Sequence, residues 1–115
     1  MTIVLVSDDK AELKLLEENV ALYYPDDLII PFNDAKTAMQ YVEGHLVDVC
    51  FTSVVMKKVS GIAIAKEIKK SNPDVLVNFI ADDETYALEA WRLHINDYIV
   101  RPINGASIAH TLRDF

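Results

Sequence analysis

Short apolar runs alternate five times with amphipathic segments along the 115 residues of this chain. The runs are short and mostly rich in β-branched residues, so they predict strands buried on both faces. They lie at residues 3–6, 28–30, 47–52, 75–80 and 97–100. This strict alternation predicts one α/β domain over residues 1–115: a doubly wound, five-stranded parallel sheet whose five helices cover both faces.

Apolar residues at helical spacing mark the segments between these runs. The first helix ends before Pro25, the second stops near Gly44, and the third spans residues 61–70. The fourth begins with the acids at 82–84, which we interpret as favourable charges at a helix N-terminus rather than as a metal site. The fifth spans residues 105–115.

The charge balance argues against nucleic acid as a partner. The net charge is −7, and no run of Lys or Arg is long enough to follow a phosphate backbone, so we expect no direct nucleic acid binding by this domain. Cys50, the single cysteine, lies in an apolar run and is predicted to be a buried, inert thiol. No basic leader and no apolar stretch of membrane-spanning length is present, so we expect a cytoplasmic protein without a membrane partner.

In an open parallel sheet, the functional crevice forms at the carboxyl ends of the strands. The residues just after the strands are therefore the candidates for function. They are Ser7, Asp8, Asp9, Ser53, Ala81, Asp82 and Arg101.

At these positions the chain resembles the receiver domain of two-component response regulators. Residues 1–9 are similar to the opening of that family, with Ser7 at the first position of its acidic pair and Asp8 at the second, followed by Asp9. Residues 47–61 resemble its third strand and following loop, which places Ser53 on the phosphoacceptor aspartate and Lys57 on a usual proline. The resemblance implies a flavodoxin-like fold with strand order 2-1-3-4-5.

The second half of the chain resembles the same family. Residues 79–81 place Ala81 on the family's switch hydroxyl, and residues 86–91 are similar to the fourth helix of LytTR-type regulators. Residues 96–102 look like the family's fifth-strand signature, with Tyr98 at the aromatic switch position and Arg101 where a lysine is usual. Departures from the family pattern at Ser7, Ser53, Ala81 and Arg101 therefore fall in one site, while the scaffold matches.

The altered residues are poorly suited to phosphoryl transfer, which uses an ionised carboxylate and magnesium. Ser53 has no histidine beside it as a base, because His45, His94 and His110 are predicted in a loop, at a helix end and in the last helix. Asp8 and Asp9 are only weak candidates for metal ligands. We therefore expect no enzyme activity, no cofactor and no resident metal.

Several side chains at the site have alternative interpretations. We hypothesise that Arg101 pairs with Asp8 across the crevice; its alternative is a solvated side chain. Tyr98 is interpreted as a packed surface tyrosine rather than a rotating switch. Trp91 is either a core residue or part of an interface with Tyr98. Lys57 and its neighbour Lys58 are either solvated or attract an anion.

The retained scaffold and altered site predict an atypical receiver that acts independently of phosphorylation, as a dimerisation or docking module for a transcriptional output domain. We expect a homodimer through the fourth helix, fifth strand and fifth helix, and a histidine kinase or fused output domain as further partner. One alternative is a conventional phosphorelay receiver with a displaced acceptor: Asp8, Asp9 or Ser53 itself. Another is a sensor of a small anion or metabolite at the crevice, using Lys57 and Arg101.

Overall fold

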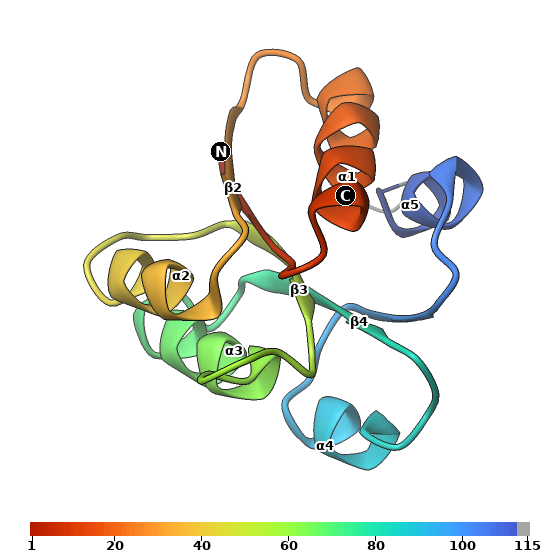
Figure 1. The fold of residues 1–115 in the computed structure, drawn as a ribbon. Coiled ribbons are helices and arrows are strands. Elements are labelled where there is room, and N and C mark those ends of the chain that lie inside the picture. The colour runs from red at the N-terminus through yellow and green to blue at the C-terminus, as the bar shows by residue number, and fades with distance from the viewer. Residues whose placement is uncertain (113–115) are drawn as a thin grey trace.

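The computed structural model describes residues 1–112 and confirms the predicted parallel sheet (Figure 1). Its strands are β1 (Thr2–Val6), β2 (Leu28–Phe32), β3 (Val49–Ser53), β4 (Leu76–Ala81) and β5 (Asp97–Val100). They are hydrogen-bonded in the order β2-β1-β3-β4-β5, and every neighbouring pair is parallel. The flavodoxin-like topology that the resemblance implied is therefore correct.

Helices cover both faces of the sheet, as predicted. They are α1 (Lys10–Tyr23), α2 (Ala35–Val42), α3 (Gly61–Ser71), α4 (Ala87–Arg92) and α5 (Gly105–Leu112). Figure 1 shows α1 and α5 together on one side, and α2, α3 and α4 on the other. The predicted last turn of the fifth helix, residues 113–115, lies outside the described residues. Among the described residues, no helix has both the length and the apolar character needed to cross a bilayer.

The strands divide their apolar side chains between two cores because successive residues of a strand point to opposite faces. Ile3 and Leu5 pack with the residues of α1 and α5, whereas Val4 and Val6 pack with those of α2 and α3. All four are fully buried, which explains the continuously apolar run. The edge strand β2 differs: it continues past the predicted end at Ile30 through Pro31, which an edge strand tolerates because one side has no partner.

The start of the fourth helix was predicted wrongly. α4 begins at Ala87, and its N-cap residue Tyr86 makes no side-chain capping bond. The acids at 82–84 therefore precede the helix in a separate segment, in which the Asp83 carboxylate accepts a hydrogen bond from the Thr85 amide at 2.9 Å. Side-chain and backbone hydrogen bonding by Thr85 lowers the pKa of this carboxyl below its ordinary value. The favourable-charge interpretation of these acids is not supported.

Candidate functional site

Four of the predicted site residues end neighbouring strands at one edge of the sheet. Ser7, Ser53 and Ala81 follow or end β1, β3 and β4, and all three are buried. Arg101 follows β5, and its side chain is 27% exposed. Asp8 and Asp9 are both exposed. The polar residues at this edge are held together mainly by Arg101.

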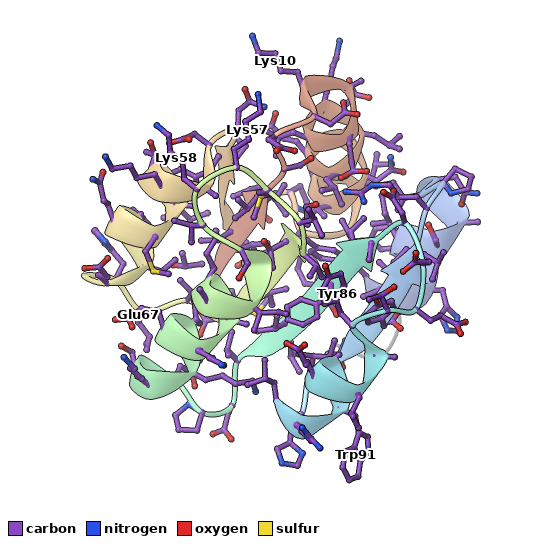
Figure 2. The ribbon with its side chains drawn as sticks, turned by 60° about the horizontal axis from the view of Figure 1, so that its bottom comes forward. Lys10, Lys57, Lys58, Glu67, Tyr86 and Trp91 are labelled. Atoms are coloured by element: carbon purple, nitrogen blue, oxygen red, sulfur yellow. The ribbon has the colours of Figure 1, made fainter. Side chains whose placement is uncertain are left out.

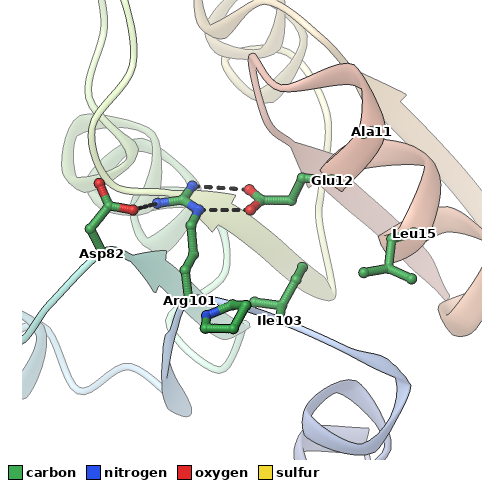
Figure 3. A pocket seen from close by; sticks show the side chains of 7 residues that line it. Ala11, Glu12, Leu15, Asp82, Arg101 and Ile103 are labelled. Atoms are coloured by element: carbon green, nitrogen blue, oxygen red, sulfur yellow. Dashed lines mark hydrogen bonds and ion pairs between the residues drawn. The ribbon is translucent and has the colours of Figure 1, made fainter.

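The guanidinium of Arg101 binds a carboxylate that the sequence analysis did not single out. Its Nε donates to Glu12 Oε2 at 2.7 Å, and its Nη2 donates to Glu12 Oε1 at 3.0 Å. Figure 3 shows the two groups facing each other across the crevice. Two parallel bonds of this kind match the fork of a guanidinium to the two oxygens of a carboxylate. The Glu12 side chain is only 8% exposed, so this pair is largely removed from water.

The hypothesis that Arg101 pairs with Asp8 is wrong. Asp8 makes no hydrogen bond or ion pair with any described residue, whereas Glu12 lies one turn into α1 and faces the sheet. A signal for this was available: Glu12, Leu16 and Val20 are spaced four residues apart, and all three are buried on the same stripe of α1. An acid on a buried stripe needs a partner, and Arg101 is that partner.

Arg101 also contacts two predicted site residues. Its Nη2 donates to Ser53 Oγ at 2.8 Å, and its Nη1 donates to Asp82 Oδ1 at 3.2 Å. The hydrogen bonds with Glu12 are the main reason that the pKa of the guanidinium lies above its ordinary value. The Asp82 side chain is 86% exposed, so its ion pair is weaker than the one with Glu12. Arg101 is thus shared between two carboxylates.

Ser7 and Asp9 are occupied by local hydrogen bonds. Ser7 Oγ donates to Glu12 Oε1 at 3.0 Å and accepts from the Asp9 amide at 3.2 Å. Asp9 is the N-cap of α1, and its Oδ1 accepts from the amides of Ala11 and Glu12. Of the acids at this edge, Asp8 alone has no partner among the described residues.

These side chains do not fit a magnesium ion. Magnesium takes several oxygen ligands in a near-ideal octahedron, usually with one or two carboxylates. In this crevice the carboxylate of Glu12 is engaged by a guanidinium, which also repels a cation. Among the described residues, no group of three or more His, Cys, Asp or Glu side chains is placed to hold a metal ion.

The loop after β3 is pressed against the site by a close backbone approach. The Gly61 amide donates to the Val54 carbonyl at 2.9 Å. A Cβ atom on Gly61 would lie 2.1 Å from the Ser53 carbonyl oxygen, so only glycine fits at this position. The sequence Lys57-Lys58 lies in the same loop, and both side chains extend outward into solvent in Figure 2.

The hydroxyl of Tyr98 ties the segment before α4 to β5. It donates to the Asp83 carbonyl at 2.7 Å and accepts from the Tyr86 amide at 3.3 Å. The side chain is partly buried, and this burial raises the pKa of Tyr98. The interpretation of Tyr98 as a packed surface residue agrees with these contacts. Segment 82–86 is therefore bonded from Arg101 on one side and from Tyr98 on the other.

Other candidates lie away from Ser53. Trp91 is 74% exposed, so its interpretation as a core residue is wrong, and its interface interpretation stays a prediction. His45 follows α2 and stacks on Tyr41, His94 follows α4, and His110 lies in α5. These are the predicted locations. The hydroxyl of Ser53 bonds Arg101 and the Val55 carbonyl, and no described histidine.

A shallow cleft of about 470 Å³ opens beside the Arg101–Glu12 pair. Its polar lining is formed by Glu12, Asp82 and Arg101, and Figure 3 shows the apolar side chains of Ile103 and Leu15 below Glu12. The described carboxylates of the lining outnumber its one cation, so the cleft does not attract anions electrostatically.

Comparison with known proteins agrees with this fold. The family model of the response regulator receiver domain matches residues 3–113. The chain is 31% identical over 105 residues to the transcriptional regulatory protein NatR of Bacillus subtilis, covering 91% of this chain and 45% of NatR. It is 28% identical over 109 residues to an uncharacterised response regulatory protein of Vibrio cholerae, covering 94% of this chain and 42% of that protein. The chain thus spans less than half the length of these relatives.

Solved structures show the same fold. The response regulatory domain of MrkE from Klebsiella pneumoniae superimposes with a TM-score of 0.86 at 22% identity, covering 99% of this chain and 93% of that one. The beryllofluoride-activated receiver domain of DrrB gives a TM-score of 0.83 at 21% identity, covering 98% and 94%. The family match extends over nearly the whole chain, and the strand order is the one that the family resemblance implied. The chain therefore belongs to the response regulator receiver domain family of two-component signalling.

Proposed function

We propose that this receiver acts without phosphoryl transfer, as a dimerisation and docking module for a transcriptional output domain. The observation that carries the proposal is the guanidinium of Arg101, which bonds both Ser53 and Glu12 inside the crevice. Phosphoryl transfer to a receiver needs an ionised acceptor carboxylate and a metal that balances charge on the moving oxygens. At the end of β3 the chain instead has a neutral hydroxyl beside a fixed cation.

Ser53 is also poorly placed to act as a nucleophile itself. A serine hydroxyl attacks only when a neighbouring base accepts its proton. Among the described residues, Ser53 Oγ bonds the guanidinium of Arg101 and the carbonyl of Val55. The guanidinium has no acceptor atom, and the carbonyl is not a base, so neither can take the proton. The hydroxyl is buried as well. We therefore assign it a structural role as an acceptor for Arg101, and we assign the domain no catalytic activity of its own.

Intact-mass spectrometry tests this proposal. The wild-type chain is incubated with acetyl phosphate and magnesium, beside a conventional receiver that keeps the acceptor aspartate as positive control. We expect phosphorylation of the control and no added phosphoryl group on this chain. A stoichiometric mass increase on the wild type would contradict the proposal. An Asp8→Asn variant would then show whether the unpaired Asp8 is a displaced acceptor, the alternative that its exposure at this edge favours.

An anion or metabolite sensor is a weaker candidate. Arg101 was expected to supply positive charge to such a ligand, but it is already paired with Glu12 and Asp82. Lys57 is exposed in the loop after β3. An anion would have to displace a carboxylate from Arg101. Thermal melting with phosphate, sulfate and small organic acids tests this, and a clear rise in Tm that disappears in an Arg101→Met variant would support the sensor.

The proposed dimer uses α4, β5 and α5. Leu88, Trp91 and Val100 are exposed large apolar side chains on this side of the domain, and a hollow of about 240 Å³ lies between α4 and β5. Exposed apolar patches of this kind mark interaction surfaces. Light scattering after size-exclusion chromatography should give a dimer without any phosphodonor. A strict monomer at high concentration would count against this part of the proposal.

The output domain is expected outside the residues of this chain. The curated relatives are about twice as long, and one of them is named as a transcriptional regulatory protein. We propose that a histidine kinase or the fused output domain is the further partner, that the receiver itself does not bind nucleic acid, and that the protein is cytoplasmic. The net charge of −7 supports the proposal that the receiver itself does not bind nucleic acid.

A further inference from the structure

A small groove separates α3 from α4, away from the crevice at the strand ends. Its volume is about 190 Å³, which suits one or two side chains better than a whole small molecule. Ile62 and Leu93 are partly buried and give the groove an apolar floor. Lys66 from α3, and Glu89 and Arg92 from α4, complete its lining, and all three are exposed.

The two cations of the groove are free. Neither Lys66 nor Arg92 forms an ion pair within the described part of the chain, whereas the neighbouring Lys70 binds Glu67 at 3.0 Å. Lys69 donates to the His94 carbonyl at 3.4 Å and so joins α3 to the end of α4. The groove itself thus carries the two cations Lys66 and Arg92 and one acid, Glu89, on a chain whose net charge is −7. Two cations without an ion-pair partner among the described residues favour a partner surface that carries acids.

Other apolar side chains of α4 are exposed outside the groove. Leu88 is 58% exposed and Trp91 is 74% exposed. Figure 2 shows Trp91 extending away from the domain at the end of α4. Trp91 lines the hollow between α4 and β5 and so belongs to the surface proposed for the homodimer. The apolar contacts of the groove come from Ile62 and Leu93, beside Arg92, and arginine is a usual anchor of protein interfaces.

We propose that this α3–α4 groove docks an acidic segment of a partner protein. The segment would place an aliphatic or aromatic side chain on Ile62 and Leu93, and carboxylates beside Lys66 and Arg92. This surface differs from the one proposed for the homodimer, which lies on the β5 side of α4 and is lined by Ala90, Ile95 and Tyr98 among others. One short helix thus presents two different binding surfaces.

The chemistry of the groove favours a peptide over a nucleic acid. Nucleic acid binding is driven by many phosphate contacts, and the groove offers two free cations and one acid, Glu89. Its floor is apolar and suits a side chain rather than a sugar–phosphate backbone. Glu89 also limits how much negative charge the groove accepts, so its removal should strengthen binding of an acidic segment.

Selection from a displayed library of random peptides on the folded chain tests the proposal. We expect selected peptides that combine Asp or Glu with Leu, Ile or Phe. One of them, made as a fluorescent peptide, should bind the Lys66→Glu/Arg92→Glu variant at least tenfold more weakly, and Glu89→Gln more tightly. Chemical shift mapping should perturb Ile62 and Leu93.

A charge-matched control separates local binding from the total charge. Lys36→Glu/Lys14→Glu makes the same change in net charge on α1 and α2 and should weaken binding much less, with circular dichroism confirming that each variant folds. The proposal is overturned if the selected peptides lack acids, if both double variants lose affinity equally, or if the shifts map to Tyr98 and Ile95. Tighter binding of a single-stranded oligonucleotide at the same residues would also overturn it.

Discussion

The crevice at the strand ends and the exposed surface of α4 are built in opposite ways. In the crevice, Ser7, Glu12, Ser53 and Arg101 bond one another and are mostly buried. On α4, Leu88 and Trp91 are exposed and have no covering element. The polar groups that could bind a small ligand are hydrogen-bonded to one another, whereas the exposed apolar side chains lie where another protein can reach them. The difference supports a domain that recognises proteins rather than one that carries out chemistry.

Segment 82–86 connects these two regions. Asp82 contacts Arg101 in the crevice, while the backbone of Asp83 and Tyr86 bonds the hydroxyl of Tyr98. The position of α4 is therefore set by contacts on both sides of this segment. Substitutions in both regions can measure how rigid the crevice is and how much of that rigidity reaches the α4 surface.

The largest effect is expected at the crevice, from Gly61→Ala. The added Cβ would meet the Ser53 carbonyl oxygen at 2.1 Å, and backbone cannot move away as a flexible side chain can. We expect the free energy of unfolding in urea to fall by about 3 kcal/mol, the upper part of the usual range for overpacking. Gly44→Ala is the matched control, because a Cβ there meets nothing within 4 Å. Equal effects of the two variants would show that the backbone approach at Gly61 is unimportant.

Arg101→Met should have the second largest effect. It leaves Glu12 without its cation in a largely buried position, and removing one partner of a buried pair is costly. Because the Arg101 side chain is 27% exposed, we expect a loss of about 2 kcal/mol, below the range for fully buried pairs. The double variant Glu12→Gln/Arg101→Met should be more stable than Arg101→Met alone. If the double variant is less stable, the pair is not coupled in the way proposed.

Tyr98→Phe removes the two hydrogen bonds that hold segment 82–86 from the β5 side. The expected loss is about 1 kcal/mol, typical of an intramolecular hydrogen bond. Trp91 is the only tryptophan, so its emission reports on α4 directly. We expect a changed emission maximum in Tyr98→Phe and none in a Tyr23→Phe control on the far end of α1. An unchanged emission spectrum would show that the hydrogen bonds of the Tyr98 hydroxyl do not influence the α4 surface.

Trp91→Ser should change stability least among the uncharged substitutions, by less than about 0.5 kcal/mol, because the side chain is mostly exposed. Its expected effect is on assembly: the dissociation constant of the proposed dimer should rise at least tenfold. Analytical ultracentrifugation measures this. Leu22→Ser, which removes a similarly exposed apolar side chain on α1, is the control and should leave the constant unchanged.

The smallest effect is expected from acid titration of Asp83. Its folded pKa is lowered by hydrogen bonds from Thr85, so its contribution to stability is present above the ordinary Asp pKa of about 4 and is lost as the pH falls through the folded pKa. Asp83→Asn should remove this part of the acid-dependent loss. The measurement is urea unfolding at several pH values between about 6 and 3 in wild type and variant. Parallel pH profiles would contradict the assignment.

Much of the site was predictable because β-strand ends are fixed by sequence pattern. Once the five strands are placed, Ser7, Ser53, Ala81 and Arg101 must lie at one edge, and the structure places them there. The partner of Arg101 was not predictable in the same way. Asp8 is nearer in sequence to the strand end, but Glu12 is one helical turn further on and faces the sheet. Only the packing of α1 decides which acid the guanidinium reaches.

The amino-acid sequence by itself determined the sheet, its two-sided core and the serine, Ser53, at the end of the third strand, because apolar periodicity and residue identity are local properties. The tertiary structure decided the role of the remaining charges. It placed Trp91 outside the core and paired Asp82 with Arg101 rather than with a helix terminus. It also left Lys66 and Arg92 in the α3–α4 groove without an ion-pair partner among residues 1–112. Such roles depend on which elements meet in space, and long charged side chains from distant segments reach one another only after the helices have packed on the sheet.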